Sequence, residues 1–259
     1  MKVVRFLGNL ILAIVLVVLI LLILLTAGGL AIARVWEQQG LDYGVSEEGS
    51  WLWVDQEPIY RYEWGAENEP TIVLVHGLDV QGSTVWAANA PDLVRRGNHV
   101  LAVDLRGFGH STREGNAEQY SIEQQALLLA KVLNDMGVER ALVVAHGWGA
   151  RVALRLAEEQ PQFVGRLALI APYEDLDYLR IWRAASRWPY TGRAATWLML
   201  SGGPIGRAMQ RRMLYTSEYL PEGYWADAAR PSHIVGTVEA LLSIAAIWEA
   251  EERSLTSYR

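Results

Sequence analysis

The 259 residues are 51% hydrophobic and carry a formal net charge of -6, a composition too apolar for a disordered chain. The acidic balance argues against a nucleic-acid-binding surface, so no nucleic-acid partner is predicted. The chain has no cysteine and only five scattered histidines, so we expect no disulfide, no metal site and no other cofactor.

The first predicted element is an apolar helix. Residues 10–33 form an uncharged stretch of 24 residues, and about 20 apolar residues suffice to cross a bilayer. Lys2 and Arg5 precede the stretch, whereas Arg34 alone follows it closely. This bias predicts a transmembrane anchor over 6–33, with membrane lipid as its partner, the N-terminus in the cytoplasm and the rest of the chain outside.

A cleaved signal peptide is the alternative, because Ala31-Ile32-Ala33 fits a small-x-small cleavage site. A signal peptide would place the remaining chain on the same side of the membrane. A linker is expected over 34–50.

The next part of the chain predicts a sheet. A β-hairpin is expected from 51–54 and 59–62, with 55–58 as its turn. Strands and helices then alternate, which favours a parallel sheet covered by helices on both faces. The expected strands are 71–75, 99–103, 141–145 and 167–170; the expected helices are 86–96, 148–159 and one that Ser121 caps, with Gln124 completing a capping box.

After Pro172 the alternation stops. Residues 173–254 are predicted to be helical, most clearly over 232–252, and to form a cap on a core of residues 51–172. Seven arginines and no acid lie between Tyr178 and Ser217. They indicate either a cap face resting on anionic lipid headgroups or an ordinary solvated surface.

Three loops point to a family. His76-Gly77-Leu78-Asp79 follows the first parallel strand, residues 104–111 follow the second, and residues 145–150 join the third to a helix. Together they resemble the α/β-hydrolase fold with a helical cap, over roughly residues 51 to 254. The resemblance implies a mostly parallel, doubly wound sheet with a helical cap insertion, here preceded by one transmembrane helix. It also implies an ancestral hydrolysis of ester-like, epoxide or alkyl-halide substrates.

The resemblance assigns roles to several loop residues. The backbone N–H groups of Leu78 and Trp148 match the two donors of an oxyanion hole. Four residues are expected to structure the loops: His76, Gly77, Asp104 and Arg106. For His76, a direct chemical role is the alternative.

The position of the catalytic nucleophile in this family corresponds to Gly147. Ala145 and Gly149 satisfy the need for small residues on either side of it, but a glycine has no group that could attack a substrate. The segment His146-Gly147-Trp148-Gly149 is similar to the His-Asp-Trp-Gly elbow of epoxide hydrolases and haloalkane dehalogenases. Because a His-Ser-Trp-Gly elbow also occurs and Asp79 stands where a proline is usual, serine and aspartate both stay open as the lost nucleophile.

The end of the printed sequence is a second departure from the family. Two further strands with a catalytic acid and a histidine are expected after the cap, yet the sequence ends at Arg259 and has no histidine after His233. We expect a truncated chain; the alternatives are a partner chain that completes the sheet, or a cap that covers the edge strand 167–170. As written, the chain is predicted to be an inactive hydrolase. The alternatives are a scaffolding module, a module that binds an apolar small molecule, or one half of a two-chain hydrolase.

Overall fold

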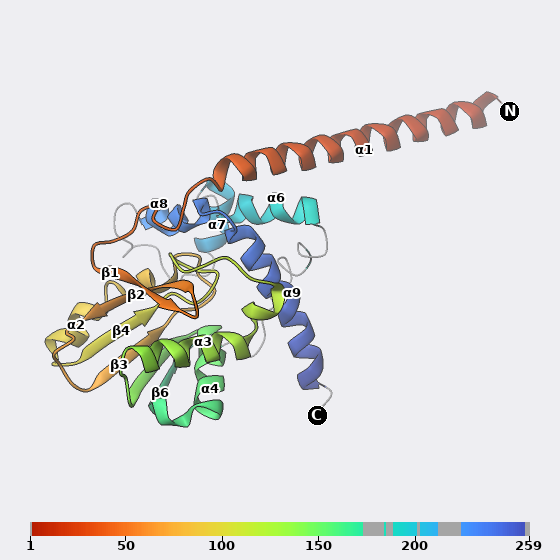
Figure 1. Cartoon of the computed structure of the whole chain (residues 1–259). Coiled ribbons are helices and arrows are strands. Elements are labelled where there is room, and N and C mark those ends of the chain that lie inside the picture. Colours follow the sequence, from red (N-terminus) through yellow and green to blue (C-terminus); the bar gives the residue numbers. More distant parts are fainter. Residues whose placement is uncertain (1, 173–183, 185–188, 201–202, 212–223, 257–259) are drawn as a thin grey trace.

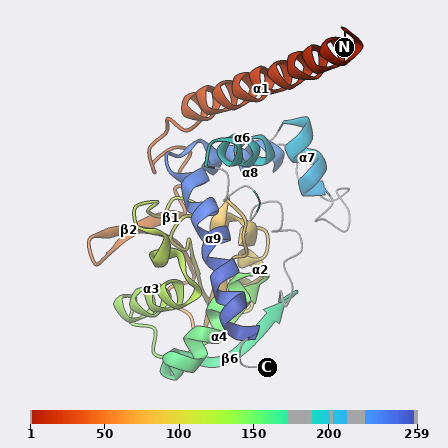
Figure 2. The ribbon, with the colours of Figure 1, turned by 90° about the vertical axis from the view of Figure 1, so that its right-hand side faces the viewer.

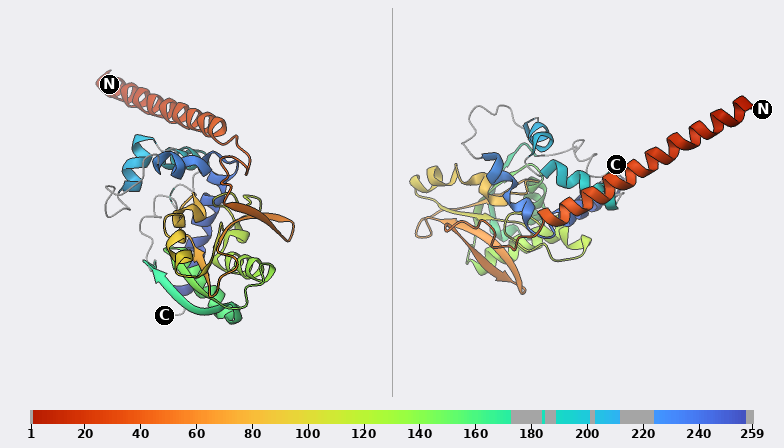
Figure 3. Two further views of the ribbon diagram at one scale, coloured as in Figure 1. Left: turned by 90° about the vertical axis from the view of Figure 1, so that its left-hand side faces the viewer. Right: turned by 90° about the horizontal axis from the view of Figure 1, so that it is seen from above.

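The computed structural model describes residues 2–172, 184, 189–200, 203–211 and 224–256. Helix α1 (Lys2–Trp36) projects from the rest of the molecule, as Figures 1 and 3 show. Within its span Arg5–Trp36, the most apolar window of 18 residues has a mean hydropathy of 3.5 and is 0% buried. The expected apolar helix is therefore confirmed. Its length and composition suit a membrane span, and a signal sequence near an N-terminus has the same features.

A mixed sheet of six strands forms the core, in the order β1-β2-β4-β3-β5-β6. Strands β1 and β2, and β2 and β4, are antiparallel, whereas all other neighbours are parallel. This confirms the predicted α/β class. The strands are β1 (Gly49–Val54), β2 (Glu57–Trp64), β3 (Thr71–Val75), β4 (His99–Val103), β5 (Ala141–His146) and β6 (Val164–Ile170).

The hairpin of β1 and β2 is confirmed, but its turn is shorter than predicted. Only Asp55 and Gln56 form the turn, with φ values of 50° and 68°. Two left-handed residues match the right-handed twist of the flanking strands. Glu57 and Pro58 therefore belong to β2, where Pro58 pairs with Trp53 near the start of the strand.

Helices cover both faces of the sheet. Helix α2 (Ala90–Arg95) and the short helix η1 (Gly82–Trp86) pack on one face, and α3 (Ile122–Asp135) and α4 (Gly149–Glu159) on the other. The single helix predicted over 86–96 is wrong, because the chain breaks between η1 and α2. Pro91 lies in the first turn of α2, where its missing N–H costs nothing, and this favours a new helix start there.

Side chains cap the start of helix α3 and the start of the short helix before it. Ser121 Oγ accepts a hydrogen bond from the N–H of Gln124 at 3.3 Å, as predicted. The reciprocal bond of a capping box is instead found one turn earlier, where Asn116 and Gln119 bond each other's backbone at the start of η2 (Ala117–Tyr120). The Ser121 N–H is occupied by the carbonyl of Glu118, which leaves it unavailable to Gln124.

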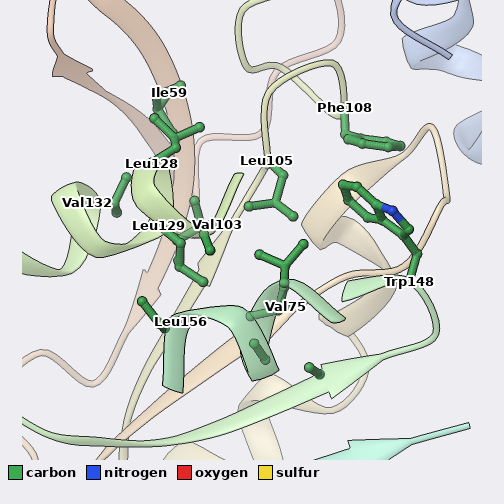
Figure 4. Close-up of a cluster of buried hydrophobic side chains, with 14 of the residues drawn as sticks. Ile59, Val75, Val103, Leu105, Phe108, Leu128, Leu129, Val132, Trp148 and Leu156 are labelled. Atoms are coloured by element: carbon green, nitrogen blue, oxygen red, sulfur yellow. The ribbon is translucent and has the colours of Figure 1, made fainter. Parts of the chain in front are cut away.

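The larger hydrophobic cluster lies between the sheet and helices α3 and α4. Figure 4 shows strand residues such as Val75 and Val103 in contact with Leu129 and Leu156 from the two helices. Burial stabilises such a cluster by roughly 25 cal/mol per Å² of apolar area removed from water. The sheet is thus a rigid support for the loops that leave its carboxyl edge.

The described residues after 172 form helices and no strand. Figure 2 shows them as a layer between α1 and the sheet, crossed by the long α9. They are α6 (Pro189–Leu200), α7 (Pro204–Arg211), α8 (Tyr224–Ala229), η5 (Arg230–His233) and α9 (Thr237–Thr256). Four of the seven arginines noted above lie outside the described residues: Arg180, Arg183, Arg187 and Arg212.

The last helix begins five residues later than predicted. Residues 232–236 are not part of α9, because Gly236 has a φ of 89° and Ile234 has an extended ψ of 131°. Ile234 instead forms a bridge with Gln39.

Strand β6 lies at one edge of the sheet. Within the described part of the chain it pairs with β5 alone, and Ile170 is 45% exposed.

Candidate functional site

The three loops singled out in the sequence leave the sheet side by side. Val75 of β3 is in register with both Val103 of β4 and Ala145 of β5. The residues that follow, His76, Asp104 and His146, therefore emerge at one carboxyl edge. Ligands of open α/β sheets bind at this edge.

The loop after β5 has the geometry of a nucleophile elbow. Gly147 lies between β5 and α4 with a φ of 56°, and its N–H donates to the carbonyl of Ile170 at 3.0 Å. A Cβ at Gly149 would lie well inside van der Waals contact of the carbonyl oxygen of His76, so only glycine fits there. The tight strand–turn–helix is therefore present, and the residue at its tip has no side chain.

His76 is fully buried and both ring nitrogens are engaged. Nε2 lies 3.0 Å from the N–H of Leu105, which can only donate, so Nε2 accepts. Nδ1 must then carry the proton that it donates to the carbonyl of Gly77 at 2.7 Å. Burial lowers the pKa of His76 below its ordinary value, which keeps the ring neutral. These contacts agree with a loop-structuring residue.

Asp104 is also fully buried and organises the loop after β4. Its carboxylate accepts hydrogen bonds from the N–H groups of Ser83 at 2.6 Å and His110 at 2.9 Å. Gly82 and Gly109 press against the carboxylate so closely that neither position has room for a Cβ. Asp104 thus joins the loops after β3 and β4.

Arg106 joins the same loop to the hairpin and to η2. Its Nε donates to Glu57 at 2.9 Å and one terminal nitrogen donates to the carbonyl of Gln119 at 2.9 Å. Gln125 of α3 completes the arrangement, because its side chain bonds both the N–H and the carbonyl of Arg106. The loop-structuring roles of Asp104 and Arg106 stay predictions.

The two expected oxyanion donors flank the elbow. Trp148 is 1% exposed, and its ring centroid lies 5.6 Å from that of Phe108. Figure 4 shows the two side chains next to each other. Leu78 is half-buried against the core. Among the described residues, the backbone N–H groups of Leu78 and Trp148 have no acceptor. A donor that is to bind a ligand must be left unpaired in this way. Their role in an oxyanion hole stays a prediction.

Comparison with known proteins fits this geometry. A sequence profile of the alpha/beta hydrolase fold matches residues 70–193. Epoxide hydrolase A of Mycobacterium tuberculosis is 40% identical over 90 residues, which are 35% of this chain and 28% of that protein. A haloalkane dehalogenase of Mycolicibacterium paratuberculosis is 29% identical over 202 residues, 74% of this chain and 66% of that protein.

Residues 70–193 of the chain thus match the α/β-hydrolase fold family. Its fold is also similar to the crystal structure of Cfl2 from Burkholderia cenocepacia, with a TM-score of 0.66 over 82% of this chain and 75% of that one, at 24% identity. The matches span between about a quarter and two thirds of the curated relatives' own length.

Beside the elbow of this hydrolase fold lies a pair of titratable side chains. A Cβ at Gly77 would meet His146 Nδ1 at 2.9 Å and Asp79 Oδ2 at 3.4 Å, so both side chains converge on one point. Burial raises the pKa of Asp79, and the nearby rings of His146 and His76 oppose that rise. Sequence reasoning noted Asp79 only as a departure from proline. The pairing arises because β3 and β5 are neighbours in the sheet, which no local pattern reveals.

Arg113 is a second residue that sequence reasoning missed. It is buried, and its guanidinium donates to the carbonyls of Phe108, at 3.1 Å, and Gly109, at 2.6 Å. Its Nε donates to Thr237 Oγ1 at 3.2 Å, which joins the loop after β4 to the start of α9. Burial lowers the pKa of Arg113 to about 10. Nothing in the local sequence marks this arginine.

Within the described residues, no group of histidine, aspartate and glutamate side chains is arranged to hold a metal ion. What the site offers is a left-handed turn, two backbone donors and the neighbouring side chains of Asp79 and His146. Such groups can orient a polar atom of a ligand, but none of them occupies the nucleophile position.

Proposed function

We propose that this hydrolase-fold protein is held at a membrane by α1 and binds an apolar small molecule at the elbow without attacking it covalently. The observation that carries the proposal is Gly147, which has the backbone conformation of the elbow and no nucleophile. The family's chemistry proceeds through a Ser or Asp at this position.

The relatives support the kind of ligand. The matching proteins are named as epoxide hydrolases and a haloalkane dehalogenase. An ancestral substrate of epoxide, alkyl-halide or ester type is apolar apart from one polar atom. Two free N–H groups beside an empty elbow suit a ligand that carries one such acceptor.

A thermal-shift screen with alkyl and acyl ligands tests this proposal on the detergent-solubilised full chain. A ligand that binds only the folded state raises Tm, because ~100-fold excess over Kd adds about 2.7 kcal/mol of stability. The Gly147→Leu variant fills the elbow and should lose the shift. Gly137→Leu is the matched control, since Gly137 has a similar φ of 68° and open space around it.

The control isolates the effect of the elbow from that of backbone strain. A shift kept by Gly137→Leu and lost by Gly147→Leu supports binding at the elbow. If no ligand raises Tm, or if both variants respond equally, the proposal is wrong.

A second candidate is one half of a two-chain hydrolase. It is favoured by β6, which pairs on one side only within the described residues and leaves Ile170 exposed. A partner that carries a strand–Asp–strand–His segment and co-purifies in equal amount would support it. An elbow that binds ligand in a stable monomer would count against it.

A further inference from the structure

The end of α1 is built into the cap rather than joined to it by a loose tether. Trp36, the last residue of α1, stacks on the ring of His233 with centroids 3.8 Å apart and an interplanar angle of 22°. Its Nε1 donates to the buried Ser232 Oγ at 2.9 Å. Trp197 of α6 meets the same indole edge-on at 5.8 Å. Three residues from two elements of the cap, η5 and α6, thus hold one tryptophan.

The residues after Trp36 continue this attachment. Glu37 Oε1 accepts a hydrogen bond from the N–H of Val238 at 2.8 Å, in the first turn of α9. The N–H of Gln39 donates to the carbonyl of His233 at 3.0 Å, and its carbonyl accepts from Val235 at 3.1 Å. The segment 34–50 was expected to be a linker, yet its first part fixes the direction in which α1 leaves the cap.

Helix α6 lies alongside the last turns of α1, as Figures 1 and 2 show. A Cβ at Gly29 would overlap the Cβ of Ala194, whereas a Cβ at Gly28 would meet nothing within 4 Å. Glycine at a helix contact lets two backbones approach closely. The contact at Gly29 therefore depends on a missing side chain.

The depth of this contact is set by the sequence of α1. Gly29 lies four residues before the end of the uncharged stretch at Ala33. At a rise of 1.5 Å per residue, Ala194 sits about 6 Å inside that end. If α1 crosses a bilayer, α6 must reach the level where headgroups meet acyl chains.

The chemistry of α6 suits that level. Arg193 is its one charged residue, and it forms an ion pair with Glu239 of α9. Leu198 is a large apolar side chain that is 39% exposed. Trp197 lies at the junction with α1, and tryptophan is enriched where membrane meets water.

We infer that α6 lies in the headgroup region of the bilayer that α1 crosses, so that the cap, and not the core, faces lipid. This rests on the membrane anchor of the proposed function. We assign lipid as the occupant of the exposed α6 surface because this surface lies next to α1, which is apolar on all sides over residues 10–33, and the two helices meet at Gly29 inside that stretch.

The absence of cysteine from the chain allows a direct test. Single-cysteine variants of the full chain are labelled with a fluorophore and placed in phosphatidylcholine–phosphatidylglycerol vesicles that carry spin-labelled lipids. Leu198→Cys reports α6, and Val17→Cys reports the middle of α1. Leu154→Cys on α4 is the matched control, since Leu154 is 42% exposed and α4 lies far from α1.

The label at position 198 should lose most of its fluorescence to a headgroup quencher, and the label at position 17 to a deep acyl-chain quencher. The label at position 154 should respond to neither. If position 17 is quenched and position 198 is not, α6 lies outside the membrane and the inference is wrong while the anchor stands. If position 17 is not quenched, the anchor itself fails, and the inference with it.

A pair of glycine variants tests the role of the α1–α6 contact. Gly29→Leu should push α6 away and reduce quenching at position 198 while leaving quenching at position 17 unchanged. Gly28→Leu, one residue earlier and facing open space, should leave both as in the parent. Equal behaviour of the two variants would contradict the proposed positioning. If the label at position 198 is shielded from the headgroup quencher, and this shielding is lost when the protein is diluted, the α6 surface is covered by a second copy of the chain instead.

Discussion

Replacing Glu37 by glutamine should make the stability of the protein less dependent on pH. Burial raises the pKa of Glu37 from its ordinary value of 4.5 to about 7, an effect that outweighs the hydrogen bond from Val238. The other charged groups that influence it are Glu239, which raises the pKa, and Arg193 and Arg113, which lower it. Because the folded state holds this proton more tightly than the unfolded state, the folded state is favoured at low pH.

The pH window and the magnitude follow from the two pKa values. The contribution of Glu37 is fully present below pH 4.5 and is lost as the pH rises to about 7, where the folded carboxyl ionises. One pKa unit corresponds to about 1.36 kcal/mol, so the full shift amounts to about 3 kcal/mol. Because Glu37 is only half-buried, solvent screening reduces this to roughly 1–3 kcal/mol.

Glu37→Gln keeps an oxygen that can accept from Val238 but cannot ionise. Its stability relative to the parent should rise by about 1–3 kcal/mol between about pH 5 and about pH 8. Urea unfolding of the detergent-solubilised chain, followed by circular dichroism, measures this difference. Glu67→Gln, at an exposed position, is the control and should show no such rise. The same difference between Glu37→Gln and the parent at both pH values would refute the reasoning.

Two further variants test the elbow. Gly149→Ala should destabilise the fold by about 1–3 kcal/mol or more, because its methyl group would collide with the backbone oxygen of His76; a parent-like urea midpoint would show that the contact is loose. Gly147→Ser should lower the free energy of unfolding by about 1–3 kcal/mol because the backbone at this position is left-handed, and Gly137→Ser should do the same. Gly147→Ser should not turn this 259-residue chain into a fast esterase. Both nitrogens of His76 are engaged, so it is not available as a base, and His233 is held in a stack with Trp36 at the end of α1. Rapid p-nitrophenyl ester hydrolysis by Gly147→Ser, lost in a double variant with His146→Gln, would show that His146 acts as a base instead.

The sheet was predictable because its strands carry strong local signals. The β-branched run at 71–75 and the apolar runs at 99–103 and 141–145 match β3, β4 and β5 closely. The elbow was implied by the resemblance of residues 145–150 to the family, and Gly147 has the left-handed φ of 56° that such a turn uses. Where a buried strand and a tight turn set the structure, local sequence is sufficient.

Other features depend on contacts between distant segments and could not be read locally. The start of α9 is displaced because Ile234 bridges to Gln39, almost two hundred residues earlier in the chain. The pair of Asp79 and His146 arises from the neighbouring places of β3 and β5 in the sheet. The attachment of Trp36 to the cap likewise joins residues that no sequence pattern relates.

The turnover of the parent chain tests the central claim most directly. Purified full-length protein is incubated with p-nitrophenyl esters and with an epoxide, beside Gly147→Leu and a buffer blank that contains the same detergent. Because Gly147 offers no nucleophile, the parent should hydrolyse each substrate no faster than the blank. Hydrolysis well above the blank that Gly147→Leu abolishes would contradict the account, since the elbow would then carry chemistry without a side chain at its tip.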